Sequence, residues 1–306
     1  MSDTVASLSR KMSSAKDLQS VVRTMKALAA SSIGQYEQSV RALGEYDRTV
    51  ELGLGVCLRP CNRAILRATE DPQATPVTLN VIVFGSDQGL VGRFNEVVAD
   101  HAVNALAALP GTPQVWAVGE RVWARLGDAG VTLAGLFPVP SSVQGITPLV
   151  DQILVKTAAR AIPGENAGLH LFYNRPTLGS VYDPVGHRLL PLDEVWCRDL
   201  AAQAWPTKWL PEVVGDPAGT LRAFIRDYLF VTLFRACAES LAAENASRLA
   251  AMQRADDNIN ELLETLRGSF RRLRQSGIDA ELFDVIAGFE ALVDPANNPL
   301  KTQPSA

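Results

Sequence analysis

The sequence predicts an α/β fold in which a mainly parallel, Rossmann-like doubly wound sheet domain lies between two long terminal helices. The first 55 or so residues contain no proline, and none occurs between Pro217 and Pro295. Between about residues 75 and 200, short apolar runs alternate with helix-like segments, which is typical of parallel strands joined by crossover helices. The two proline-free ends and the middle segment, in which strand-like and helix-like runs alternate, therefore indicate three parts of the chain.

The N-terminal part, residues 1–57, is predicted to be one continuous helix. Its apolar positions make ten steps in 35 residues, a mean spacing of 3.5. That spacing is typical of a left-handed coiled coil rather than of a straight surface helix. So narrow a stripe needs a partner helix. The positions are Leu8, Met12, Ala15, Leu18, Val22, Met25, Ala29, Ser32 or Ile33, Tyr36, Val40 and Leu43.

The C-terminal part, residues 217–292, is the predicted partner. Pro217 suits the first turn of a helix. Apolar residues then step mostly by three and four, at Leu249, Met252, Ile259, Leu262, Leu266, Phe270 and Leu273. Two helices far longer than the globular mean, at opposite ends of one chain, predict an antiparallel coiled coil. Residues 295–306 are polar and contain proline, so we expect a disordered tail.

The middle part, residues 75–200, is predicted to form the sheet domain. Strands are expected at 77–84, 111–120, 131–137 and 168–176, and helices at 95–109, 121–129 and 146–162. A polar hairpin through Asp183-Pro184-Val185-Gly186 then leads into residues 187–192. Alternation of strands and helices favours a doubly wound sheet with helices on both faces.

Composition excludes several classes of protein. Of 306 residues, 47% are hydrophobic and 20% are charged, which is ordinary for a soluble globular protein, and the net charge of -4 gives no general attraction to nucleic acid. No apolar segment approaches the roughly 20 residues of a membrane span. The N-terminus lacks the apolar core of a secretory signal. Cys57 and Cys61 have no neighbouring histidine, so no metal site is predicted.

The segment Phe84–Asn95, FGSDQGLVGRFN, places three glycines between a predicted strand and a predicted helix. Gly85, Gly89 and Gly92 follow neither the dinucleotide fingerprint nor the Walker pattern, and the loop contains no lysine. We therefore predict no bound cofactor. The glycines would let the loop turn against other backbone, with Ser86, Asp87 or Asn95 bracing it or capping the next helix.

Three motifs resemble those of one family, the gamma subunits of F-type ATP synthases. Ser86–Asn95 resembles its Ser-Asp-basic-Gly-Leu-Cys-Gly-small-aromatic/Leu-Asn motif. Thr24–Ser31 is similar to its Ala-Met-x-Met-Val-Ala-Ala-Ser, and Glu244–Met252 to its Glu-x-x-Ala-Arg-Met-x-Ala-Met. The motifs occur in the family's order and span about residues 5 to 292. Departures include Gln88, Val91 and Arg93 in the loop motif, and Asp256 where Thr is usual. These, with the acidic net charge, suit a divergent second copy of the complex.

The resemblance implies a non-catalytic rotor that couples ion flow through a membrane c-ring to ATP synthesis or hydrolysis in an alpha/beta ring. It implies alpha, beta and epsilon subunits and the c-ring as partners, and a peripheral position at the cytoplasmic face of the cell membrane. It also implies a beta-subunit coupling interface formed by Met25, Lys26, Arg248, Gln253, Arg254 and Gln275, with Arg248 exposed. Ser86, Asp87, Gly89, Gly92 and Asn95 would be packing residues.

Two other functions stay open at this point. One is an α/β nucleotide-binding enzyme with helical extensions, which binding of ATP or NAD would favour. The other is a coiled-coil scaffold without an ATPase partner, which neighbouring genes for alpha, beta, epsilon and c subunits would argue against. The sequence shows no Ser-His-Asp set, carboxylate pair or metal cluster, so we expect no active site in this chain.

Overall fold

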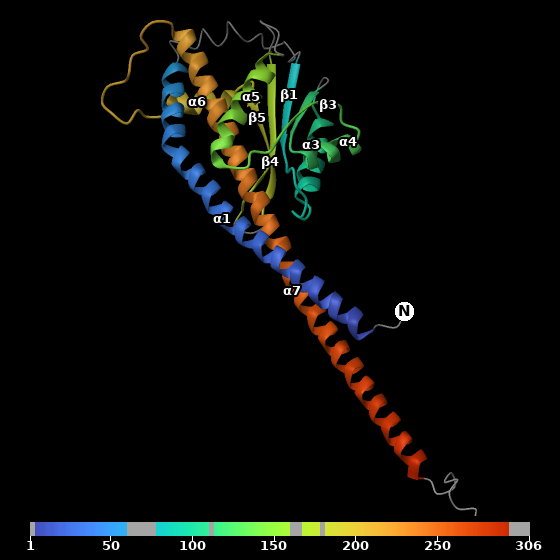
Figure 1. Cartoon of the computed structure of the whole chain (residues 1–306). Helices are drawn as coiled ribbons and strands as arrows, with labels where there is room; N and C mark the ends of the chain where they lie inside the picture. Colours follow the sequence, from blue (N-terminus) through green and yellow to red (C-terminus); the bar gives the residue numbers. More distant parts are fainter. Residues whose placement is uncertain (1–3, 60–77, 110–112, 160–166, 178–180, 294–306) are drawn as a thin grey trace, which may run out of the picture. The chain divides into compact units, whose positions relative to one another are not determined.

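The computed structural model describes residues 4–59, 78–109, 113–159, 167–177 and 181–293. The predicted tail, 295–306, lies outside them. The chain forms two compact units, one of residues 1–25 and 252–306 and one of residues 26–251. Helices α1 (Val5–Cys57) and α7 (Pro217–Val293) each contribute to both units (Figure 1). Their bounds lie close to the two ranges in which the sequence predicts long helices.

In the smaller unit, α1 and α7 pack as an antiparallel pair. Gln19 Nε2 donates to Asn260 Oδ1 at 2.6 Å, whereas Arg23 Nε lies 3.3 Å from Asp256 Oδ1. A later residue of α1 thus meets an earlier residue of α7, as an antiparallel pair requires. The buried positions recur at heptad spacing, as expected for a left-handed coiled coil: Leu8, Ala15 and Val22 on α1, and Met252, Asp256, Ile259 and Leu263 on α7.

Two positions of the predicted apolar stripes are wrong by one residue. Leu18 is 55% exposed and Leu262 is 50% exposed, whereas their neighbours Gln19 and Leu263 are buried, at 9% and 3%. The sequence pattern favoured the apolar Leu18 over the polar Gln19. Gln19 is nevertheless tolerated inside because its amide donates to Asp256 and Asn260, and a buried polar group with partners costs little.

The larger unit is built on a five-stranded sheet with strand order β3-β2-β1-β4-β5. The strands are β1 (Thr78–Phe84), β2 (Pro113–Val118), β3 (Leu133–Phe137), β4 (Ala167–Arg175) and β5 (Asp183–Leu190). The first four are parallel, and β5 runs antiparallel to β4 at the edge. This is the mainly parallel sheet that the alternating pattern predicts.

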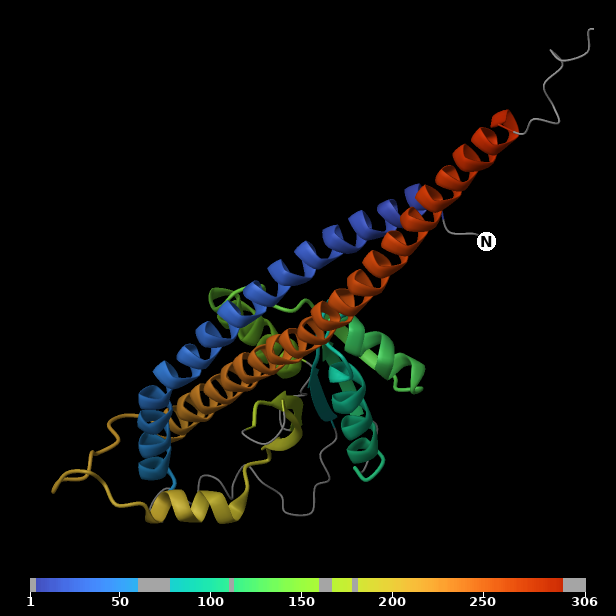
Figure 2. The same cartoon turned by 90° about the horizontal axis from the view of Figure 1, so that it is seen from below.

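Helices cover both faces of this sheet, which confirms the doubly wound prediction (Figures 1 and 2). On one face, α3 (Phe94–Leu106) and α4 (Glu120–Asp128) pack against Leu79, Val81 and Val83 of β1. On the other, α5 (Ile146–Ala159), after a short 3-10 turn (Val143–Gly145), packs with α7 against Ile82 and Phe84. Alternate residues of β1 therefore face opposite cores, and the strand is apolar throughout.

The predicted hairpin is present, because β4 and β5 pair antiparallel, but Asp183–Gly186 lie in strand β5 rather than in its turn. They pair with β4 from Arg175 to Phe172. Pro184 lacks an N–H, which an edge strand tolerates. A Cβ at Gly186 would lie 2.7 Å from the Phe172 ring, so glycine serves close packing there. Pro184 and Gly186, which look like turn residues in the sequence, are thus residues that suit an edge strand.

One further helix, α6 (Glu194–Ala202), was missed by the sequence analysis. Its signal was present, because Asp193 is an N-cap residue whose carboxylate accepts from Trp196 N–H at 2.8 Å. Leu200 of α6 packs with Leu54 and Cys57 of α1 and with Leu221 of α7. Cys57 is therefore a buried packing residue, and Cys61 lies outside the described residues.

The heptad assignment is tested by two adjacent leucines of α7. We expect Leu263→Ala to lower the free energy of unfolding by about 2–3 kcal/mol, because it removes a buried side chain from the coiled coil. Leu262→Ala should change it by less than about 0.5 kcal/mol, because that side chain is half exposed. Urea unfolding and amide exchange of α1 residues measure both. Equal losses would contradict the assignment.

Candidate functional site around the glycine loop

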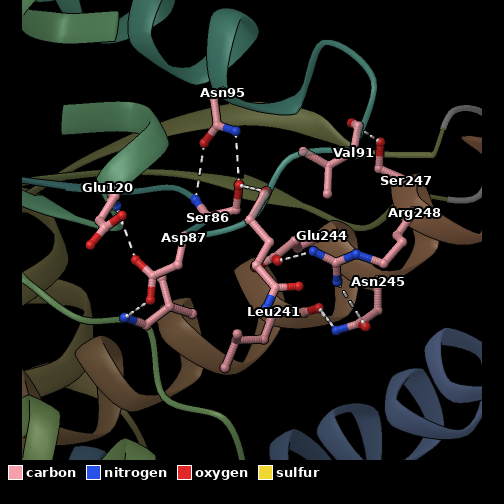
Figure 3. Close-up of polar contacts among 12 residues, drawn as sticks. Ser86, Asp87, Val91, Asn95, Glu120, Leu241, Glu244, Asn245, Ser247 and Arg248 are labelled. Atoms are coloured by element: carbon pink, nitrogen blue, oxygen red, sulfur yellow. Dashed lines mark hydrogen bonds and ion pairs between the residues drawn. The ribbon is translucent and has the colours of Figure 1, made fainter. Parts of the chain in front are cut away.

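The glycine-rich loop after β1 is held by a set of internal hydrogen bonds (Figure 3). Ser86 N–H donates to Asn95 Oδ1 at 3.0 Å, and Asn95 Nδ2 donates back to Ser86 Oγ at 2.8 Å. The Ser86 hydroxyl in turn donates to the carbonyl of Gln88 at 2.8 Å. Ser86 and Asn95 are both buried. The two side chains therefore close the loop against the start of α3.

Asp87 joins the loop to two other elements. Its Oδ1 accepts from Glu120 N–H at 3.0 Å, and its Oδ2 accepts from Val139 N–H at 2.9 Å. Glu120 is the first residue of α4, so the carboxylate occupies the helix N-terminus, where an anion is favoured. We expected Ser86, Asp87 or Asn95 to brace the turn or to cap the next helix; Ser86 and Asn95 brace it, and Asp87 caps α4. These backbone donors serve the protein's own carboxylate rather than a phosphate.

The loop glycines differ in what they contribute. Gly92 has φ +58°, a left-handed conformation that glycine adopts without strain. At Gly89, by contrast, an added Cβ would meet nothing closer than 3.8 Å. At Gly85 an added Cβ would lie 2.4 Å from the Val122 side chain. Gly119, just before α4, has φ +116°, and a Cβ there would lie 2.8 Å from the Ser86 backbone. Gly85, Gly92 and Gly119, rather than Gly89, are the glycines that the turn requires.

The loop also packs against the α7 segment that carries the third motif. Val91 and Phe94 form a small core with Ala243, and Ser247 Oγ donates to the Val91 carbonyl at 2.5 Å. The central and C-terminal motifs therefore contact each other within the larger unit, one on a loop of the sheet and the other on a face of α7. This contact supports the interpretation of the loop as a packing element.

Arg248 is mostly buried, which corrects the expectation of an exposed helix position. Its Nη2 lies 2.6 Å from Glu244 Oε1, and its Nη1 donates to Asn245 Oδ1 at 3.3 Å. The side chains of Arg248 and Glu244 are only 14% and 7% exposed. Burial raises the pKa of the Glu244 carboxyl, and Arg248 acts in the opposite direction. Arg248 is thus already paired within its own helix.

A cavity of about 330 Å³ lies between the loop, α1 and α7 in the larger unit. Tyr36 of α1 and Asp87 and Gln88 of the loop contribute to its lining, together with Glu244 and Arg248 of α7. Burial raises the pKa of Tyr36, and the nearby Glu244 carboxylate adds to that shift. Glu244 was absent from the predicted interface, although its i,i+4 spacing to Arg248 predicts an ion pair on a helix.

The other predicted interface residues divide between the units. Met25, Gln253, Arg254 and Gln275 belong to the smaller unit, and Lys26 to the larger one. Gln253 and Gln275 each donate to an aspartate four residues later, Asp257 at 3.1 Å and Asp279 at 3.0 Å. Arg254 is exposed. Their roles as partner contacts stay predictions.

Comparison with known proteins identifies the family. The family described as ATP synthase matches residues 4–292. ATP synthase gamma chains from Parafrankia sp. and Nostoc punctiforme are 26% and 27% identical to this chain. The alignments cover 94% and 92% of this chain, respectively, and 97% of each relative. This chain belongs to the gamma-chain family of ATP synthases. It is the non-catalytic central-stalk, or rotor, subunit of an F-type ATP synthase, so the enzyme alternative is set aside.

Solved structures share the fold. A chain of the Euglena gracilis mitochondrial ATP synthase structure covering OSCP, F1 and c-ring superposes with a TM-score of 0.61 at 16% identity, with 99% of each chain covered. A chain of the Tetrahymena thermophila central stalk and c-ring structure gives 0.54 at 19% identity, covering 77% of this chain and 99% of that one. Among the described residues, no helix combines the length and apolarity that a membrane crossing requires.

The close approach of Gly119 to Ser86 can be tested with a matched pair of substitutions. Gly119→Ala should cost about 3 kcal/mol or more, because it adds both backbone strain and a clash with the Ser86 backbone. Gly127→Ala, inside α4 with open space around it, should stabilise the protein by about 0.5–1 kcal/mol. Thermal unfolding measures both. A neutral Gly119→Ala would contradict the bracing role of the loop.

The Arg248–Glu244 pair predicts a loss that a second substitution restores. Arg248→Met should lower the free energy of unfolding by about 3 kcal/mol, because a buried carboxylate is left without its cation. Arg248→Met with Glu244→Leu should recover most of that loss. Arg254→Met is the matched control and should change it by less than about 0.5 kcal/mol. Chemical denaturation of these variants and the wild type measures the losses. A double variant that is no more stable than Arg248→Met would contradict the pair.

Proposed function

We propose that this chain is the rotating shaft between a membrane c-ring and a ring of alternating alpha and beta subunits, with an epsilon subunit as a further partner. The observation that carries the proposal is the heptad-packed antiparallel pair of α1 and α7 in a gamma-chain family member. One asymmetric shaft contacts three otherwise equivalent catalytic sites differently, and each site is biased toward a different affinity by that contact. Rotation then moves the bias around the ring.

The proposed beta-subunit interface comprises Met25, Lys26, Arg248, Gln253, Arg254 and Gln275. Arg254 and Gln253 suit direct contact, because both are exposed on α7. Arg254 forms no ion pair within the described residues. Arg248 suits a different role, because its guanidinium is held by Glu244. We therefore assign direct carboxylate contact to Arg254, and to Arg248 the task of fixing the α7 surface beside it.

The last turns of α7 suit an apolar bearing in the ring. Every residue from 276 to 290 is exposed, and several are large and apolar: Ile278, Leu282, Phe283, Val285, Ile286 and Phe289. An exposed apolar stripe on one helix usually marks a contact with another protein. Arg267, Arg271, Arg272 and Arg274, just before it, would meet acidic groups of the ring or remain solvated. The proposed location is peripheral, at the cytoplasmic face of the cell membrane.

The proposed function predicts a coupling defect at Met25. Met25→Lys should place a charge where an apolar side chain slides past an acidic beta loop, and a partly desolvated ion pair there would cost a few kcal/mol to break at each step. We expect near-normal assembly with alpha and beta, but a lower ratio of ATP-driven ion uptake to ATP hydrolysed in vesicles.

Leu18→Lys is the matched control, because it adds the same charge to an exposed position of α1. It should leave the ratio unchanged. An unchanged ratio in Met25→Lys would remove Met25 from the interface. Failure of the wild-type chain to assemble with alpha and beta at all would contradict the proposed function itself.

A further inference from the structure

Glu244, which lines the cavity beside the glycine loop, has a buried carboxylate oxygen without a donor. Only 5% of the surface of Glu244 is exposed to solvent. Its Oε1 is bonded to Arg248, whereas its Oε2 is buried and has no hydrogen-bond partner among the described residues. An unsatisfied oxygen of a buried carboxylate is costly. The site therefore lacks one hydrogen-bond donor.

The charges around the cavity indicate that the missing donor is a cation. Two carboxylates line it, Asp87 and Glu244, against one guanidinium, that of Arg248. Asp87 is satisfied by two backbone N–H groups, which are neutral and leave its charge in place. The lining thus carries one net negative charge. Burial raises the pKa of Glu244; Arg248 opposes that shift, and the charge of Asp87 adds to it.

The apolar residues of the cavity wall favour an organic cation that is carried on an aliphatic chain. Val139, Pro140 and Leu241 form apolar wall, which suits methylene groups, and Lys and Arg side chains bury such stems while the charged head finds a partner. Oε2 itself is shielded from solvent, so a wall side chain must move for a donor to reach it. Gln88 suits this movement, because it is exposed and no hydrogen bond of its amide is seen among the described residues.

We propose that this cavity receives a Lys or Arg side chain from another protein subunit, which donates to Glu244 Oε2. Gln88 is the entrance residue, because it lies on the loop at the cavity and brings no charge of its own. That the subunit belongs to the ATP synthase complex rests on the proposed function. The cation site itself does not, since it follows from the charges and the unsatisfied oxygen of this chain.

The cation site is tested on the isolated full-length chain. Millimolar butylguanidinium should raise the unfolding temperature at pH 8, whereas butylurea, its neutral counterpart of the same shape, should not. Gln88→Arg should raise the unfolding temperature by about 3 °C without any probe, because its own guanidinium enters the cavity, and should abolish the response to butylguanidinium. Gln88→Met, the uncharged control, should keep that response. Equal responses to both probes, or an undiminished response in Gln88→Arg, would overturn the site.

The partner is tested by reconstitution with alpha and beta subunits. Gln88→Arg should weaken association at least about tenfold, because the cavity is already filled, and Gln88→Met should weaken it less. Unchanged association of Gln88→Arg would overturn the assignment of the partner. A wild-type chain that responds to butylguanidinium but does not assemble would contradict the proposed function and this partner, while the cation site would stand.

Discussion

The register between α1 and α7 is the constraint on which the rest of the structure depends. Apolar heptad positions alone allow two long helices to slide past one another by whole heptads. Polar pairs do not, because a slip leaves a buried donor or acceptor unsatisfied. Gln19 with Asp256 and Asn260 fixes the pairing in the smaller unit, and the Arg235–Asp47 ion pair fixes it in the larger one. Each unit thus has its own polar contact that fixes the register between α1 and α7.

The glycine loop likewise fixes the position of the sheet through polar contacts. A strand end, two helix starts and α7 converge on it, and nearly every polar group of Ser86, Asp87 and Asn95 is used in holding them. Such a loop is rigid because each hydrogen bond restrains a different element. For a rotor subunit, a stiff junction between sheet and helix is the useful property. The loop resembles phosphate-binding turns in composition only, since its anion is its own Asp87.

Much of the fold could be predicted from the sequence, because period and proline placement are local signals. The limits of α1 and α7, the four parallel strands and the three helices between them follow from such signals. The errors arose where tertiary contacts overrode them. Gln19 is buried because α7 supplies Asp256, and Pro184 lies in a strand because that strand is at an edge. Arg248 lines a cavity together with Asp87 and Gln88 of a loop far away in the sequence, and no local pattern describes that neighbourhood.

Two departures from the family's motifs differ in how the chain accommodates them. Asp256 places a carboxylate in a coiled coil, and the same chain supplies Gln19 and Arg23 as donors within 3.3 Å. The carboxylate of Asp256 therefore has its donors within this chain, and it needs no partner from another subunit. Gln88 has no such compensation, because the carboxylate of Glu244 beside the cavity keeps an oxygen without a donor. A substitution whose polar group finds partners within the chain preserves stability. A substitution that leaves a buried carboxylate without a donor leaves that donor to be supplied by a partner protein. Divergence at Gln88 is therefore the change that bears most directly on which subunits this shaft accepts.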